Sequence, residues 1–341
     1  MKKQAEFSFV IPNSLLMVSS AISTRKFIIQ NSTINEIVNF IGSSFEGVGV
    51  ETIILNFSKC TADDNVIRVF ISETNKIEYS HDKSQKGFCN NQDFQFNVFS
   101  NDKTEELIQK LKATSEIFDS VVTIKAGLQA YETGKGNPKQ TPDDVKNRPY
   151  DFDYKFDENT FQYLEGKDVG RYFIKWAGSF LQYGNHLASP RTFDLFTGET
   201  IIIREITSNH PKSINASYTD ETYLFNRSNI AIKKTKNSKV ELKYALALLN
   251  SKLISYYFMK NTAKSVRQLF PKLILEDLRK FPIKDIDSIH QQPFIEKVNQ
   301  ILAIKKEDSK SDTSELEAEI DRMVYELYEL TEEEILIVEG K

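Results

Sequence analysis

Residues 160–204 read TFQYLEGKDVGRYFIKWAGSFLQYGNHLASPRTFDLFTGETIIIR, and this stretch decides the fold class. Short apolar runs alternate in it with glycine, asparagine and proline, and the alternation continues to about residue 235. Such a pattern predicts a mostly β domain built from short strands. Residues 240–259 (VELKYALALLNSKLISYYFM) then predict one strong, largely buried helix.

The first 60 residues show a different order of elements. They predict a buried strand at 7–11, a helix at 19–30 and two strands at 34–40 and 50–57, which is an α/β pattern. A chain that opens with a buried strand gives that strand few partners. We therefore expect these residues to be the end of a larger α/β domain, with a small complete α+β domain as the alternative. Further predicted elements are strand-like runs within 66–99, a helix at 103–118 and helices at 290–306 and 314–330.

Length and composition indicate a folded chain of two or three domains. The 341 residues are 40% hydrophobic and 27% charged, which argues against disorder. Cys60 and Cys89 cannot supply a disulfide framework, so we expect a reducing, cytoplasmic location. The apolar run near the N-terminus lacks a clean signal-peptide cleavage site, and no run has the apolar length of a membrane span.

The charge is distributed unevenly along the chain. Residues 165–285 hold 20 Lys and Arg against 11 Asp and Glu, a balance of +9, whereas residues 286–341 hold 6 against 15. Residues 1–164 hold 18 against 22. A basic middle between acidic ends could attract a polyanion to one region only, although a solvated basic surface without a partner explains the charge equally well.

Two motifs suggest catalysis but lack the required context. The segment Phe45–Gly49 (FEGVG) has the F-x-G-x-G form of an S-adenosylmethionine loop, yet a predicted strand follows it where the cofactor site needs a helix. Asp143 after Pro142, with Glu165 and Lys167, matches a loose metal-dependent nuclease pattern. Asp143 falls in a predicted loop, 134–150, whereas such chemistry needs a rigid strand. The four histidines and two cysteines have no metal-ligand spacing, so we predict no metal site.

The basic middle also mixes side chains that can read DNA. Arginine and asparagine can pair with guanine and adenine edges, and lysine and arginine bind phosphates. The candidates interleave these groups with aromatic rings, against the alternative that each is an ordinary surface or core residue. They are Lys135, Arg171, Lys175, Tyr183, Asn185, Arg191, Arg204 and Asn226, with Arg227 next to them and Lys264, Arg267 and Gln268 after the predicted helix.

Blocks of sequence in a fixed order resemble a known family. "STRKFIIQNSTINEIVNF" and "FEGVGVETIILNFSK" resemble the end of the catalytic domain in adenine-specific DNA methyltransferases of the Eco57I and TaqI type. "YLEGKDVGRYFIKW", "LQYGNHLASPRTFDLFTGETIIIRE" and "YALALLNSKLISYYF" resemble the TaqI-like target-recognition domain that follows it. The family's catalytic Asn-Pro-Pro-Tyr or Asn-Pro-Pro-Phe segment and its cofactor loop are absent here. We therefore assign no catalytic or cofactor-binding residue, and expect S-adenosylmethionine to belong to the intact parent enzyme.

The sequence thus predicts an α+β, multi-domain protein with three parts. Residues 1–125 would be the remnant of an α/β methyltransferase sheet with a connector, residues 126–285 a mostly β target-recognition domain with an embedded helix, and residues 286–341 a helical tail. The predicted partner is double-stranded DNA, with an upstream catalytic part or a separate catalytic subunit as a second partner. A nuclease using Asp143, Glu165 and Lys167, and a protein-interaction subunit that docks through its acidic tail, remain the alternatives.

Within the DNA-binding candidates we expect a division of roles. Arg171, Arg191 and Arg204 would read guanine, and Asn185 and Asn226 would read adenine. The lysines at 135, 175 and 264, together with Arg267, would contact phosphates.

Overall fold

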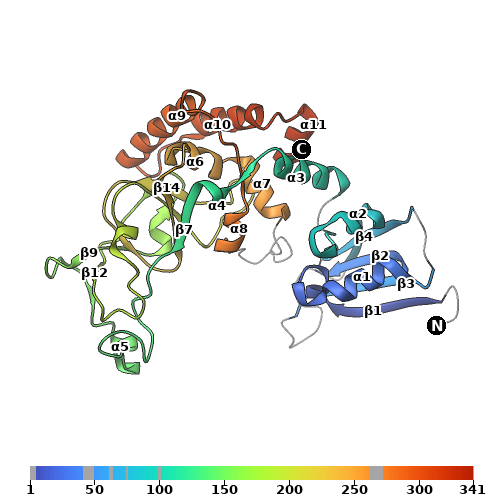
Figure 1. Cartoon of the computed structure of the whole chain (residues 1–341), viewed down its shortest axis with the longest axis horizontal. Coiled ribbons are helices and arrows are strands. Elements are labelled where there is room, and N and C mark those ends of the chain that lie inside the picture. Colours follow the sequence, from blue (N-terminus) through green and yellow to red (C-terminus); the bar gives the residue numbers. More distant parts are fainter. Residues whose placement is uncertain are drawn as a thin grey trace. The chain divides into compact units, whose positions relative to one another are not determined.

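The computed structural model describes residues 5–40, 50–60, 64–73, 76–98, 101–261 and 272–340. The described chain divides into two compact units, one on residues 1–109 and a second that begins at Lys110 (Figure 1). Both units mix helices and sheets, so the protein is α+β and multi-domain, as the sequence predicts. No helix in the described ranges is long and apolar enough to cross a membrane.

Unit 1 is a five-stranded mixed sheet in the order β1-β3-β2-β4-β5. β2 and β4 run parallel, and every other neighbouring pair is antiparallel. Buried residues of the sheet, among them Ile37, Leu55 and Val69, pack with Ile29 of α1 and Phe88 of α2. The elements are β1 (Glu6–Pro12), two 3-10 turns (Asn13–Leu16 and Ser19–Ala21), α1 (Ile22–Asn31), β2 (Thr33–Phe40), β3 (Thr52–Ser58), β4 (Val66–Glu73), β5 (Lys76–Ser84), α2 (Gln85–Asn90), a turn at Gln92–Phe94 and α3 (Asp102–Ala113), whose residues from Lys110 on belong to unit 2.

Unit 2 contains two four-stranded sheets and a group of helices. One sheet has the order β14-β13-β16-β7 and is antiparallel throughout; the other has the order β15-β9-β12-β8, with β15 and β9 parallel. The strands are β6 (Glu116–Ile117), β7 (Val122–Ala126), β8 (Asp151–Phe152), β9 (Thr160–Leu164), β10 (Val169–Gly170), β11 (Phe173–Ile174), β12 (Phe180–Gln182), β13 (Thr200–Arg204), β14 (Ala216–Thr219), β15 (Leu224–Phe225), β16 (Asn229–Lys234) and β17 (Pro282–Ile283). The helices are α4 (Phe118–Val121), α5 (Pro142–Asn147), α6 (Leu242–Leu249), α7 (Lys252–Asn261), α8 (Leu275–Arg279), α9 (Ser288–Glu307), α10 (Ser314–Leu327) and α11 (Glu332–Glu339).

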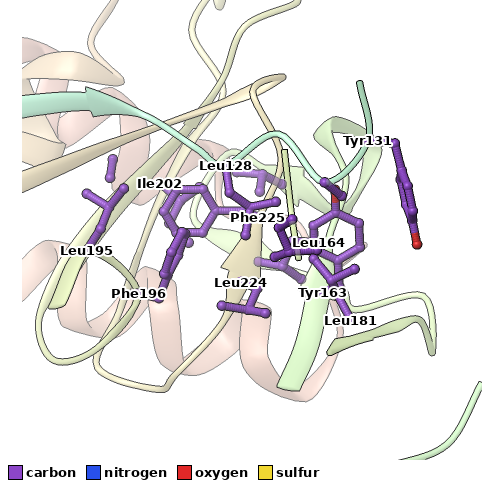
Figure 2. Packing of buried hydrophobic residues seen from close by; sticks show 14 residues of the cluster. Leu128, Tyr131, Tyr163, Leu164, Leu181, Leu195, Phe196, Ile202, Leu224 and Phe225 are labelled. Atoms are coloured by element: carbon purple, nitrogen blue, oxygen red, sulfur yellow. The ribbon is translucent and has the colours of Figure 1, made fainter. Parts of the chain in front are cut away.

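A buried cluster joins the two sheets of unit 2. Leu164 and Phe225 from paired strands pack with Phe196 and Ile202, and Tyr131 stands at the edge of the cluster (Figure 2). This core fixes the loops that leave the strand ends. In Figure 1, α6, α9 and α10 lie together at one end of unit 2, and α5 lies at the other end.

The C-terminal helices pack on the rest of unit 2. α9 packs against α6, and the Tyr328 hydroxyl donates to the Pro282 carbonyl at 3.0 Å. Ion pairs add to this contact: the Lys110 ammonium lies 2.7 Å from Glu334, and that of Lys252 lies 2.9 Å from Glu339. Acidic side chains of residues 286–341 therefore form ion pairs with basic groups of the same unit.

Several predicted elements differ from the observed ones for reasons that a local pattern does not contain. The predicted helix 103–118 ends at Ala113, because residues 116–117 form β6 and pair with β17, which lies far along the chain. The predicted helix 240–259 is two helices. Asn250 donates to the Ala216 carbonyl, and the Ser251 hydroxyl accepts from the Ile254 amide at the start of α7. The strand-like run FQFNVF at 94–99 does not form a strand over its described residues, 94–98, and the sequence missed β5 and α11.

Candidate nucleic-acid interface

A crossing of three segments forms the base of the candidate site. After β7, Leu128 pairs with Asn226 and Gln129 pairs with Ser189 as isolated bridges. A Cβ atom on Gly127 would lie 2.3 Å from the Asn226 carbonyl oxygen, so only glycine permits this approach. Segments 60 and 98 residues apart in the sequence are thereby held together at this point.

The loop from Glu132 to Thr141 is held by one buried amide. The Gln140 side chain is 3% exposed, and its nitrogen donates to the carbonyls of Ala130 and His186, each at 2.8 Å. Its oxygen accepts from the Glu132 amide, also at 2.8 Å. These bonds fix the backbone of a loop whose glycine and proline content alone does not define one conformation. Lys135 and Lys139 are exposed on this loop.

The same loop contacts the segment around Asn185. The Asn137 amide donates to the Asn185 carbonyl at 2.8 Å. Gly136 has φ +84°, and a Cβ atom there would lie 2.4 Å from the His186 carbonyl oxygen. The loop that carries the exposed Lys135 is thereby bonded to the segment that carries the exposed Asn185 side chain.

A stack of side chains, made of three rings and one guanidinium group, packs against these loops. The rings of Tyr131 and Tyr150 lie 5.8 Å apart, the His186 ring lies 4.1 Å from that of Tyr150, and the Arg148 guanidinium lies 4.9 Å above Tyr131. The Tyr131 hydroxyl donates to Asp151 at 2.9 Å. Burial and the Asp151 charge both raise the pKa of Tyr131, so this donor keeps its proton at neutral pH.

Two exposed arginines lie beside the crossing. Arg191, with φ +63°, donates from Nε to the Gly127 carbonyl at 3.2 Å. Arg227 donates from Nη1 to the Gln129 side-chain oxygen at 2.6 Å. We call the exposed polar groups of segments 127–141, 183–191 and 226–228 the loop surface.

The segments of the loop surface contain five of the DNA-binding candidates named from the sequence, together with Arg227. Two of the five use their side chains in hydrogen bonds to nearby backbone groups. The Tyr183 hydroxyl donates to the Arg191 carbonyl at 2.8 Å, and the Asn226 side chain accepts from the Ser228 amide at 3.0 Å. The other three present exposed side chains. The five are Lys135, Tyr183, Asn185, Arg191 and Asn226.

Arg171 and Arg204 do not have the free guanidinium groups that the sequence prediction needs. The Arg171 side chain is 14% exposed; its Nη2 lies 2.6 Å from Glu317 of α10, and its Nη1 donates to the Ile214 carbonyl. Arg204 donates from Nε to the Ile206 carbonyl at 2.7 Å, and burial lowers its pKa. Protein groups therefore occupy both guanidinium groups. The partners of Arg171 come from distant segments, whereas Ile206 lies only two residues from Arg204.

The remaining candidates lie elsewhere. Lys175 is exposed just after β11 and lines a separate polar hollow of about 550 Å³ next to α9. Lys264, Arg267 and Gln268 fall outside the described residues. Gln129 and Lys139 were missed. Gln129 is an isolated polar residue in the sequence and bonds to Arg227 across 98 positions, and Lys139 lies in the predicted loop 134–150.

The catalytic alternatives gain no support from the described residues. Among these there is no group of three His, Cys, Asp or Glu side chains that could hold a metal ion. Glu165 forms an exposed ion pair with Lys167 at 3.0 Å, and Asp143 lies exposed in the first turn of α5. The segment Phe45–Gly49 is outside the described residues, but β2 and β3 on either side of it are antiparallel neighbours. The next described element along the chain is thus a strand, whereas an S-adenosylmethionine loop leads into a helix.

Comparison with known families identifies this β-rich region. Residues 161–283, from β9 to β17, match the model of the TaqI-like C-terminal specificity domain. The chain carries a TaqI-like specificity domain. Arg191 and Arg227 lie inside the matched residues, and the supporting loop 132–141 precedes them.

Two similar proteins extend the likeness beyond the specificity domain. A putative type II restriction enzyme and methyltransferase of Methanocaldococcus jannaschii, RM.MjaORFECS2P, is 26% identical over 337 residues. The match covers 96% of this chain but 27% of that protein, so this chain spans about a quarter of its relative. The type IIL restriction-modification enzyme MmeI, solved with DNA, has the same fold over 96% of this chain and 47% of its own, at TM-score 0.53 and 11% identity.

Proposed function

We propose that this chain reads the sequence of double-stranded DNA within a type II restriction-modification system. The loop surface would be its DNA-contacting face. The observation that carries the proposal is the set of ordered, exposed cations and amides over the crossing at Gly127, within and beside a specificity domain. The basic balance of residues 165–285 supports it, because DNA binding draws most of its affinity from phosphate charge.

The geometry suggests a division of roles on this surface. Lys135 and Lys139 stand on the loop held by Gln140, with flexible stems and compact charges suited to phosphates. Arg191 and Asn185 are exposed over the ordered base and suit base edges. Lys175, Lys264 and Arg267 stay proposals for phosphate contacts and Gln268 stays a proposal for a DNA contact, whereas Arg171 and Arg204 are withdrawn as base readers.

The direct test uses the full chain and a library of random duplexes. Bound duplexes are recovered and sequenced after several rounds of selection. The proposal predicts enrichment of one short sequence, together with affinity that falls as salt rises, by ~0.9 in the logarithm per phosphate neutralised and per tenfold change in salt. Binding without sequence enrichment, or no binding at low salt, would contradict it.

We further propose that unit 1 completes a methyltransferase domain whose catalytic part and S-adenosylmethionine site belong to a separate segment or subunit. β1 is an edge of the described sheet, and Phe9 and Val10 on it are 48% and 54% exposed. An apolar groove of about 480 Å³ runs beside it, lined by Phe9, Ile28 and Phe57 among others. The Methanocaldococcus jannaschii relative is about four times as long as the region it shares with this chain. Its remaining length is sufficient for a catalytic part that would cover this groove.

A charge placed on the β1 edge tests this second proposal. Phe9→Asp should leave the folding of the chain unchanged, because Phe9 is half exposed. The variant should lose co-elution with a methyltransferase catalytic part that is supplied as a separate chain and that co-elutes with the wild type. Lys86→Asp, at an exposed position on α2, which follows the opposite edge strand β5, is the matched control. Unchanged co-elution of Phe9→Asp, or equal loss in the control, would refute docking at this edge.

A further inference from the structure

One pair on the loop surface joins residues that no local pattern connects. Arg227 lies at the tip of the turn between β15 and β16, and Gln129 lies on the segment that crosses beneath it. The Arg227 Nη1 atom donates to the Gln129 side-chain oxygen at 2.6 Å. The Gln129 nitrogen in turn donates to the Tyr131 carbonyl at 3.2 Å, so both ends of this amide are held.

The backbone around Arg227 is also fixed. The Asn226 side chain accepts from the Ser228 amide at 3.0 Å, and the Asn226 carbonyl accepts from the Asn229 amide at 3.0 Å. Asn226 itself is anchored by its bridge to Leu128. An exposed arginine therefore stands on a constrained turn, which reduces the entropy lost when its guanidinium binds a ligand.

The charge of this guanidinium is not neutralised by its partner. Gln129 is a neutral acceptor, and no ion pair to Arg227 or Arg191 occurs among the described residues. Arg191 bonds to the Gly127 carbonyl, two residues before Gln129 on the same extended segment. Two arginines thus contact the same short segment, with a fixed amide next to one of them.

We propose that Arg227, positioned by Gln129, reads a guanine of the recognised sequence through its major-groove edge. One Nη1 hydrogen is used by Gln129, and the remaining hydrogens of the fork can donate together to guanine N7 and O6. A lysine ammonium carries the same charge but cannot present two parallel donors. Gln129 is a positioning residue that limits the directions in which the fork can point. This assignment rests on the proposed DNA-reading function.

Selection from random duplexes tests the pair in the full chain, with four variants compared. Arg227→Ala should abolish the preference for guanine at one position and leave the others, since a bidentate arginine discriminates by about 5- to 150-fold. Arg227→Lys should keep the overall affinity for DNA but not that preference. Gln129→Ala should weaken the preference at the same position by a smaller factor. Arg322→Ala, an exposed arginine on α10, is the control and should enrich the wild-type sequence.

The outcomes separate this assignment from the function on which it rests. If the wild type enriches no sequence, the proposed function fails and the base assignment fails with it. If the wild type enriches a sequence and Arg227→Ala enriches the same one, only the assignment is wrong. Equal weakening at every position would make Arg227 a phosphate contact and would also overturn it. Thermal melting of each variant within a few degrees of the wild type shows that the turn still folds.

Discussion

Arg171 should stabilise unit 2 and should not contribute to reading DNA. Its guanidinium lies 2.6 Å from one oxygen of Glu317, and the side chains of the pair are 14% and 9% exposed. Lys212 lies 2.9 Å from the same oxygen, and the Thr313 hydroxyl donates to the other at 2.9 Å. Arg171→Ala therefore leaves a buried carboxylate with two of its three donors.

The loss of unfolding free energy in Arg171→Ala depends on the hydrogen-bond donors that Glu317 keeps. Breaking a buried ion pair so that one charge loses every partner costs ~3–5 kcal/mol. Because Lys212 and Thr313 stay, we expect a loss near or below the bottom of that range, about 2–3 kcal/mol of unfolding free energy. For a unit of this size, such a loss lowers the melting temperature by about 4–12 °C.

Urea unfolding followed by circular dichroism measures this loss, and a filter-binding titration of the folded variant measures DNA affinity. Lys280→Ala is the control, because Lys280 pairs with Glu276 on the exposed surface and should change stability by less than about 0.5 kcal/mol. The reasoning is refuted if Arg171→Ala melts like the wild type. It is equally refuted if the variant keeps its stability but loses preference at one base, since Arg171 would then be the base reader that the sequence predicted.

Three further predictions concern the pH response, the loop and the salt response. Burial raises the pKa of Glu317, but the charges of Arg171 and Lys212 outweigh burial and hold the pKa below its ordinary value of 4.5. The ionised carboxylate therefore stabilises the fold above pH 4.5, and this contribution disappears as the pH falls below that value. Wild type and Glu317→Gln should accordingly differ in melting temperature at about pH 7 and converge towards about pH 3. Gly136→Ala should lower DNA affinity more than Gly134→Ala, because both glycines have positive φ but only a Cβ on Gly136 meets the His186 carbonyl; equal affinities in a titration would contradict the packing of this loop. Lys135→Ala should reduce the slope of log affinity against log salt by about 1 without changing the selected sequence, and an unchanged slope would remove Lys135 from the phosphate contacts.

Local sequence patterns predicted the helices and strands of both units better than the boundaries between them. The strands at 34–40 and 50–57 follow from alternating apolar residues, and the structure confirms them as β2 and β3. The long buried helix was wrong at Asn250, because this side chain bonds to a strand that precedes it by 34 residues. A pattern within a window cannot contain that partner.

The candidate site was partly predictable for the same reason. Composition placed the arginines in one basic region, and the loop surface does bring Arg191 and Asn226 together around Gly127. Composition could not show that Glu317, 146 residues away, occupies Arg171, or that Gln129 lies under Arg227. Only the tertiary fold separates arginines with structural partners from arginines that stay exposed.

Hydrogen exchange with and without duplex DNA tests the central claim most directly. The loop surface is the proposed contact, so DNA should slow the exchange of backbone amides in residues 132–141, 184–191 and 226–228. Amides of α9 and α10, which Figure 1 places at the other end of unit 2 from α5, should exchange at the same rate in both states. Protection confined to those helices, with none on the loop surface, would contradict the account.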